Sequence, residues 1–232
     1  MPTTLPMFAE QGHIMVHLDD GTALIDTGSP FSFSTIPVVF AGIRYNLPQH
    51  FPGNISPAML SSLLGFRIDC CIGTDILTQA AIRIRWHEQC IDIGDDLPDG
   101  EVKLPLQTLH GCPAFPVSIG DTQTNALLDT GANLSYVDPI LVEGLQPIGH
   151  KEDVHPMSGS FITPIYPLDT SVATGVVTLQ YGVLPDILRQ PLQLFLQEID
   201  GRVLIGTELF RHFDCTIAWN RKTISWTHSG DG

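Results

Sequence analysis

The sequence predicts an all-β protein with two similar β-barrel-like lobes, a few short helices and a cleft between the lobes. Short runs of branched and aromatic residues alternate with Gly, Pro, Asn and Asp through most of the chain, which is typical of strands joined by turns. Two segments of the first half also recur in the second half. These repeats predict that both lobes are built on the same plan.

The first repeat is centred on the tripeptide Asp-Thr-Gly. Residues 23–34 read ALIDTGSPFSFS and residues 126–137 read ALLDTGANLSYV, so six of twelve positions are identical when Asp26 is set on Asp129. Each segment is an apolar strand that runs into a tight turn. A single Asp-Thr-Gly is an ordinary strand-end turn, but two in the same context indicate a shared role.

The second repeat contains an apolar-apolar-Gly sequence. Residues 72–93 align with residues 205–226 without a gap, and six positions are identical. The spacing from the Asp of the first motif to the Gly of the second is 47 residues in the first half and 77 in the second. The residues expected to pack behind the turns, rather than to contact a ligand, are Ile72, Gly73, Leu204, Ile205 and Gly206.

With both motifs in both halves, the chain resembles the aspartic peptidases of the pepsin and retropepsin type. The resemblance covers nearly the whole chain, and the closest description is a retropepsin dimer fused into a single polypeptide. It implies an aspartic endopeptidase that hydrolyses peptide bonds with water activated between Asp26 and Asp129, without a metal or a cofactor. The residues that would support the two loops are Thr27, Gly28, Ser29, Thr130, Gly131 and Ala132.

A carboxylate pair suits this reaction. Hydrolysis needs one group that takes a proton from water and another that donates a hydrogen bond to the scissile carbonyl. Two carboxylates about 3 Å apart cannot both ionise, so one shared proton lets the pair fill both roles. Gly28 and Gly131 allow backbone N–H groups to approach the carboxylates. The threonine hydroxyls would bond across the lobe junction, as the resemblance implies.

The residue after the glycine differs between the loops, since it is Ser29 in one and Ala132 in the other. A hydroxyl at this position can bond the carboxylate and favour its ionised form. The mixed pair therefore leaves the pH optimum open.

A change of composition at residues 92–98, DIGDDLP, predicts the boundary between the lobes. The first lobe is expected to comprise residues 1–97, and the second lobe residues 98–232. For the first lobe we expect a hairpin of strands 13–18 and 22–26, then a strand at 31–40 that is broken by Pro37. A loop at 47–57 leads into a helix that begins at Ser56-Pro57 and ends at Gly65. A strand at 67–73, a short helix within 72–77 and a hairpin at 81–93 complete the lobe.

The second lobe is also expected to consist of strands. They cover 101–106, 116–119, 124–129 and much of 162–184, while 190–197 alternates as a strand does and 201–226 repeats the end of the first half. The tripeptide at residues 169–171, Asp-Thr-Ser, imitates the first motif but lacks its glycine. We interpret it as a turn.

The longer motif spacing in the second half leaves room for a long hairpin. In the families that the chain resembles, a β-hairpin flap closes over bound peptide and excludes water. The best candidate is residues 155–164, HPMSGSFITP, and the first half offers only QHFPGNISP, which suits a short turn. We therefore expect a single flap from the second lobe, the reverse of pepsin-like enzymes; the alternative is a surface loop beside an open cleft. The expected tip residues are Met157, Ser158, Gly159 and Ser160.

Composition limits the class of partner. Eleven Lys and Arg against 25 Asp and Glu give a net charge of -14, which repels nucleic acid and anionic membranes. The sequence shows neither a signal peptide nor a stretch of ~18 apolar residues. Five cysteines without metal-site spacing are expected to be reduced and buried, which fits a cytoplasmic protein. We expect a monomer that binds a peptide or protein substrate in an extended conformation.

Other functions fit the sequence less well. The main alternative is a catalytically weak or inactive peptide-binding module on the same bilobal shell, because binding needs only the cleft. His150 and His155 suit loop residues better than metal ligands, and Cys112 beside His110 suits a turn better than a thiol nucleophile. The sequence contains neither a GxSxG nucleophile elbow nor a Gly-rich phosphate loop.

Overall fold

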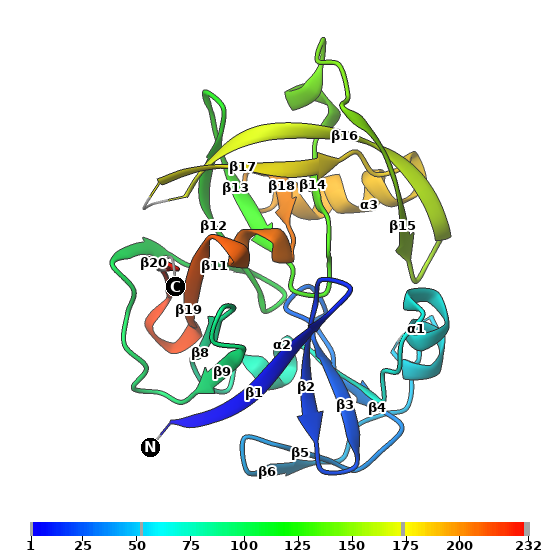
Figure 1. Ribbon diagram of the computed structural model, residues 1–232, viewed down its shortest axis with the longest axis vertical. Coiled ribbons are helices and arrows are strands. Elements are labelled where there is room, and N and C mark those ends of the chain that lie inside the picture. Colours follow the sequence, from blue (N-terminus) through cyan, green and yellow to red (C-terminus); the bar gives the residue numbers. More distant parts are fainter. Residues whose placement is uncertain (1, 52, 173–174, 230–232) are drawn as a thin grey trace.

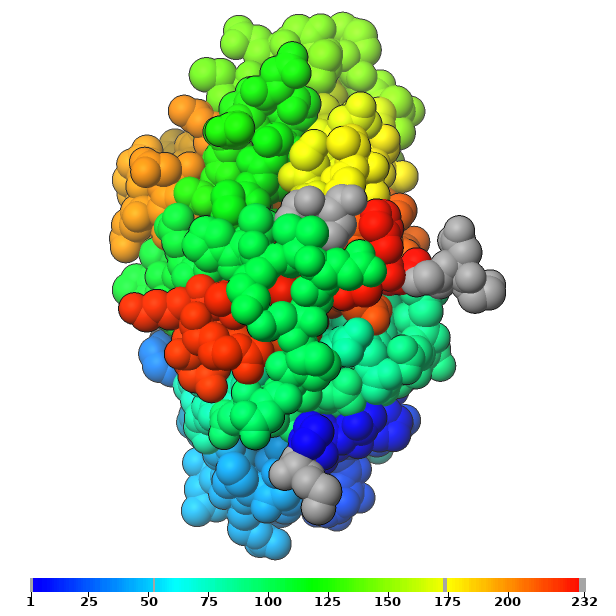
Figure 2. Space-filling view, turned by 90° about the vertical axis from the view of Figure 1, so that its left-hand side faces the viewer, coloured from blue at the N-terminus to red at the C-terminus, as the bar shows by residue number. Residues whose placement is uncertain are grey.

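The computed structural model describes residues 2–51, 53–172 and 175–229. The molecule is elongated, with the first half of the chain at one end and the hairpin strands of the second half at the other (Figures 1 and 2). The C-terminal segment, red in Figure 2, crosses the middle of the molecule. Within the part of the chain that the structure describes, no helix combines the length and apolar character that crossing a bilayer would take.

A ten-stranded sheet joins the two halves. Its strand order is β10-β20-β19-β8-β9-β1-β2-β3-β7-β4, so strands from the second half form one end of it. The junction is the antiparallel pair β19 and β8, in which Cys215 lies opposite Ile84. The strands are β1 (Thr3–Glu10), β2 (His13–Leu18), β3 (Gly21–Ile25), β4 (Phe33–Ser34), β7 (Cys70–Ile72), β8 (Ile82–Arg85), β9 (Cys90–Ile93), β10 (Val102–Pro105), β19 (Phe213–Ala218) and β20 (Thr223–His228).

Local signals explain the other elements of the first half. A short hairpin, β5 (Val38–Phe40) and β6 (Ile43–Tyr45), follows β4. Helix α1 (Pro57–Leu64) begins where the Ser56 hydroxyl accepts a hydrogen bond from the Met59 N–H at 3.2 Å, and it ends at Gly65. Helix α2 (Thr74–Leu77) follows β7 directly.

An eight-stranded sheet forms most of the second half, in the order β11-β12-β13-β18-β14-β17-β16-β15. The parallel pair of β13 with β18 reproduces the parallel pair of β3 with β7. Three short 3₁₀ segments, η1 (Pro139–Val142), η2 (Thr207–Arg211) and η3 (Trp219–Arg221), connect strands. The strands are β11 (Gln107–Leu109), β12 (Cys112–Ile119), β13 (Thr122–Leu128), β14 (Ser135–Val137), β15 (Gly149–His155), β16 (Gly159–Val172), β17 (Gly175–Gly182) and β18 (Gly201–Ile205).

One predicted strand is a helix. Residues 190–197 belong to α3 (Asp186–Gln197), where Leu188, Leu192 and Leu196 recur every fourth residue and face the protein. The apparent alternation arose because Leu194 and Phe195 are apolar but 66% and 47% exposed. A helical period therefore explains the burial better than a period of two.

Two further expectations were wrong in detail. The Asp-Thr-Ser tripeptide is not a turn, because Asp169 lies inside β16 and pairs with Thr178 of β17. The expected strand 31–40 is two short strands, β4 and β5, with bends between them. Strand β1 was not predicted, and it contributes the pairs to β2 and β9 that tie the first half to the shared sheet.

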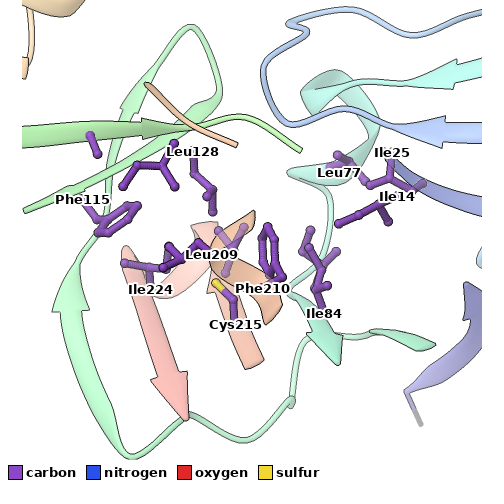
Figure 3. Close-up of a cluster of buried hydrophobic side chains, with 14 of the residues drawn as sticks. Ile14, Ile25, Leu77, Ile84, Phe115, Leu128, Leu209, Phe210, Cys215 and Ile224 are labelled. Atoms are coloured by element: carbon purple, nitrogen blue, oxygen red, sulfur yellow. The ribbon is translucent and has the colours of Figure 1, made fainter. Parts of the chain in front are cut away.

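One hydrophobic core runs through the junction. Figure 3 shows Ile84 of the first half beside Phe210 of the second, and Leu77 and Leu209 belong to the same cluster. The Trp226 side chain is fully buried, with the Phe115 ring 5.1 Å away. Fully burying a large apolar side chain stabilises a fold by roughly 1.5–3 kcal/mol. The shared core therefore holds the two halves in a fixed relative position.

The fold is all-β with a few short helices, which confirms this part of the predicted fold class. The division at residues 97 and 98 stays a prediction. In the structure this region crosses between the halves, and the Arg221 guanidinium donates hydrogen bonds to the carbonyl oxygens of Asp95 and Leu97 at 2.8 and 3.1 Å.

Candidate active site

The two Asp-Thr-Gly loops face each other at the ends of β3 and β13. A methyl group built on Gly28 would lie 2.3 Å from the carboxyl carbon of Asp129, and one built on Gly131 would lie 2.5 Å from that of Asp26. Each aspartate thus lies directly against the glycine of the opposite loop. A larger residue at either glycine would displace the carboxylate.

Backbone donors hold each carboxylate in place. Asp26 accepts hydrogen bonds from the N–H groups of Gly28 and Ser29, both at 3.0 Å. Asp129 accepts one from Gly131 at 2.9 Å. These contacts fix the orientation of both side chains within their loops.

The threonines of the two loops bond crosswise. The Thr27 hydroxyl donates to the Leu128 carbonyl at 2.7 Å, and the Thr130 hydroxyl donates to the Ile25 carbonyl at 2.6 Å. The same hydroxyls accept from each other's backbone N–H groups at 2.9 and 3.0 Å. Both threonines are fully buried. The four hydrogen bonds bind the loops to one another, as the resemblance implied.

The environment favours one shared proton. Burial raises the pKa of Asp26, against the hydrogen bonds from Asp129, Gly28 and Ser29. Burial and the charge of Asp26 together raise the pKa of Asp129 well above its usual range. The pair therefore carries one negative charge over a range of pH in which two separate aspartates would carry two.

The apolar-apolar-Gly segments pack behind the loops. A methyl group on Gly73 would lie 2.7 Å from the backbone of Phe31, and one on Gly206 would lie 2.5 Å from the Ala132 carbonyl oxygen. The backbone N–H groups of Thr74 and Thr207 donate to the Ser29 and Ala132 carbonyl oxygens at 2.8 and 2.9 Å. Both loops are thus supported in the same way.

One member of this set differs from the others in its surroundings. Ile72 and Ile205 are fully buried. Leu204, which we expected to be a packing residue, also lines the cavity above the aspartates. It is therefore in a position to contact a ligand.

The Ser29 hydroxyl does not bond the carboxylate. It donates to the Phe31 carbonyl oxygen at 2.8 Å, and only the backbone N–H of Ser29 reaches Asp26. The backbone N–H of Ala132 also contributes to lowering the pKa of Asp129. The difference between Ser29 and Ala132 therefore affects the carboxylates less than the sequence suggested.

Three side chains at the loops were not predicted as site residues. The Cys71 thiol donates to Asp26 Oδ2 at 3.7 Å, and the Cys112 thiol donates to the Gly28 carbonyl oxygen at 3.5 Å. His13 Nδ1 lies 3.0 Å from the Gly131 carbonyl oxygen. His13 and Cys112 each begin a strand after a turn and each reach the loop of the other half. For Cys71, the available signal was its alignment with Leu204 in the second repeat.

A cavity of about 350 Å³ opens above the aspartates. Leucines of α1 form one side of it and leucines of α3 form another. The hairpin of β15 and β16 covers it, and Figure 1 shows the tip of this hairpin beside α1. Its lining includes Asp26, Asp129, Leu60, Leu63, Leu188 and Leu192.

The hairpin is the segment that we predicted as a flap. His155 pairs with Gly159, and residues 156–158 form the turn. His155 and Met157 line the cavity, whereas Ser158, Gly159 and Ser160 do not. Among the described residues of the first half, β5 and β6 form only a short hairpin, and α1 occupies the side facing the flap.

A hydrogen bond joins the hairpin of β15 and β16 to β14, the strand that follows the second Asp-Thr-Gly loop. The Tyr136 hydroxyl, on β14, donates to the carboxylate of Asp153 on β15. Burial and the charge of Asp153 raise the pKa of Tyr136, so the hydroxyl stays protonated. The ring of Phe161 lies 6.3 Å from that of Tyr136. Tyr136, Asp153 and Phe161 all line the cavity.

The possible metal ligand His155 and the possible nucleophile Cys112 lie in turns or at strand ends, as the sequence favoured. His155 Nδ1 accepts a hydrogen bond from the Met157 N–H at 3.2 Å, within the flap turn. Cys112 begins β12 after the turn at His110, and all five cysteines are buried and free. The described residues contain no cluster of three or more His, Cys, Asp or Glu side chains placed to hold a metal ion.

Comparisons with known proteins add little to this description. No family model matches the chain, and no curated protein matches it. Among solved structures, it is similar to the solution structure of the simian foamy virus (mac) protease, with 19% sequence identity and a TM-score of 0.30. That similarity covers 41% of this chain and 88% of the viral protein.

Proposed function

We propose that the protein is an aspartic endopeptidase, in which Asp26 and Asp129 activate water to hydrolyse peptide bonds. The observation that carries this proposal is the paired loop geometry. Each carboxylate lies against the opposite glycine, and reciprocal threonine hydrogen bonds lock the loops together beneath a cavity. A pair held in this way has the proximity and the shared proton that the chemistry needs.

The proposed reaction uses one proton and one water molecule. The ionised carboxylate takes a proton from water while the water oxygen attacks the scissile carbonyl carbon. The protonated carboxyl gives its proton to the carbonyl oxygen, which forms a neutral tetrahedral diol. In the collapse of the diol, one hydroxyl returns its proton to the carboxylate that had protonated the carbonyl oxygen, the carbon–nitrogen bond breaks, and the other carboxyl gives its proton to the leaving amine. The pair then again holds one proton.

The cavity supports an extended peptide as substrate. β15 is one of the two edge strands of the second sheet, and its outer edge leaves backbone groups for a peptide in strand conformation. Leucines of α1 and α3 line opposite parts of the cavity. We therefore propose cleavage between residues with large apolar side chains. Closure of the hairpin over the peptide would exclude water from the reaction.

The test is cleavage of an unstructured protein from about pH 3 to about pH 7, with the cleavage sites mapped by mass spectrometry. Wild-type protein should cut next to apolar residues. Asp26→Asn and Asp129→Asn should each lose at least about 10³-fold in rate, because one reaction needs both carboxylates. Asp169→Asn is the matched control, since Asp169 is the exposed aspartate of the Asp-Thr-Ser imitation and the variant should retain full activity.

Two results would contradict the proposal. One is turnover by Asp26→Asn or Asp129→Asn protein whose thermal unfolding shows an intact fold. The other is binding of the unstructured protein by wild type without any cleavage across the pH range. The second result would favour the peptide-binding module, which needs the cavity but not the pair.

A further inference from the structure

The two aspartates have unequal neighbours, although their loops are repeats. Cys71 and Leu204 occupy equivalent positions of the second repeat, one residue before Ile72 and Ile205. Cys71 lies beside Asp26 and offers a thiol hydrogen, while Leu204 offers none. This difference places a side-chain donor on only one member of the pair.

Strand register directs the Cys71 thiol to the loop. On β7, Cys70 and Cys71 point to opposite faces, as successive residues of a strand do. Cys70 packs in the core cluster that joins the halves, whereas Cys71 packs with Leu24 and Phe33 under the cavity. Its sulfur lies 3.7 Å from Asp26 Oδ2, within range for a sulfur donor.

The Cys71 thiol stays protonated while the aspartates titrate, because its pKa is raised well above the usual range. Cys71 is fully buried, and burial together with the charge of Asp26 raises its pKa well above the usual range. A protonated thiol donates more strongly to a carboxylate than to a neutral carboxyl. It therefore favours the state in which Asp26 is the ionised member.

We propose that Cys71 is a positioning residue, whose thiol hydrogen bond keeps the negative charge of the pair on Asp26 and the shared proton on Asp129. The proposal rests on the proposed function and assigns the two roles within it. Asp26 takes the proton from water. Asp129 gives its proton to the carbonyl oxygen, and the proton that Asp26 received passes to the leaving amine.

The other titratable side chains near Asp26 and Asp129 lie on other elements than β7, the strand of Cys71. Cys112 of β12 is buried beside Gly28, and burial raises its pKa to about 12. Burial lowers the pKa values of His13 and His155, so both favour the neutral form. The titratable side chains that face the pair or its cavity are Cys71, Cys112, His13, Tyr136, Asp153 and His155.

The kinetic test is the acid limb of kcat/KM, which reports formation of the singly charged pair. In Cys71→Ala the limb should move to higher pH by about one unit, because a donor to the carboxylate is lost. In Cys71→Ser, which keeps a donor and nearly the same volume, the limb should stay at the wild-type pH or move lower. Cys70→Ala is the matched control, because it removes an equally buried neighbouring thiol that faces away.

A second readout does not need activity. The infrared S–H stretching band that disappears in Cys71→Ser should shift to lower frequency in wild-type protein as the pH rises and Asp26 ionises. In Asp26→Asn the band should not respond to pH. If wild-type protein cleaves nothing, the proposed function fails, and the infrared titration alone then decides whether the thiol bonds an ionised Asp26.

Clear results would overturn the proposal. One is an S–H band that does not move with pH in wild-type protein. Another is an acid limb that is the same in Cys71→Ala as in Cys70→Ala. If Cys71→Ala does not fold, an acid limb at higher pH in Cys71→Ser would equally contradict the proposal, since the hydroxyl is the stronger donor.

Discussion

The two halves share the base of the site and differ in its walls. In each half, an Asp-Thr-Gly loop follows a strand that pairs in parallel with an apolar-apolar-Gly strand. The second half adds the long hairpin of β15 and β16, while the first half places α1 at the same cavity. The base of the site therefore follows the duplicated scaffold, whereas its cover comes from a single hairpin of the second half.

The largest expected effect tests the symmetry of the base. Thr27→Val and Thr130→Val should each lower the free energy of unfolding by about 2–4 kcal/mol, because each removes two buried hydrogen bonds and leaves partners unsatisfied. Urea denaturation measures the change. Thr178→Val, at an exposed position, should change stability by less than about 0.5 kcal/mol. Clearly unequal losses for Thr27 and Thr130 would show that the base is not symmetric.

The next largest effect tests whether the hairpin of β15 and β16, which only the second half supplies, acts as a flap. Gly159 has a φ of 72° at the end of the flap turn, with open space around it. Gly159→Val strains this turn, so kcat/KM for peptide cleavage should fall by about 10- to 100-fold. The matched control is Gly120→Val, at the turn between β12 and β13, where φ is 53° and space is also open. Equal kinetics for the two variants would remove the flap role.

A smaller effect concerns pH and the unequal carboxylates. Both carboxyls have pKa values raised in the folded protein. Such a group stabilises the fold fully below its unfolded pKa, near about 4, and that contribution is lost as the pH rises through the folded pKa. Asp129→Asn should therefore raise Tm relative to wild type at about pH 7, with the gain vanishing near about pH 3.

The same series separates the two aspartates. Asp26→Asn should raise Tm at neutral pH less than Asp129→Asn does, because it also loses the ionised acceptor of the Cys71 thiol. Calorimetry across the pH range measures both variants. A larger gain for Asp26→Asn would assign the shared proton to the other member.

The last prediction is that dilution has no effect on specific activity. Because β8 of the first half pairs with β19 of the second within one chain, we propose that the protein acts as a monomer. Specific activity should stay constant on dilution to nanomolar protein. A steep loss of activity, together with dissociation of a dimer seen by light scattering, would contradict this expectation.

Local sequence patterns were sufficient for much of the scaffold. The hairpin before Asp26, the capped helix α1 and the closing hairpin of β8 and β9 follow from turn residues, capping residues and alternation within a few positions. Helix α3 was missed because exposed Leu194 and Phe195 obscured its period. Strand β1 was missed although β2 follows it directly in a hairpin, because only Met7 of its residues is buried and Pro6 interrupts its pattern.

The sequence by itself determined the duplication, the pairing of Asp26 with Asp129 and the longer insertion of the second half. Identical residues at matching positions of each repeat carry the first two, and the unequal separation of the two repeats carries the third, before any folding is considered. Only the tertiary structure decided that Cys71 touches Asp26, that His13 and Cys112 reach the opposite loops, and that the flap meets α1. These contacts join segments far apart in the chain, and strand register and packing across the sheets bring them together.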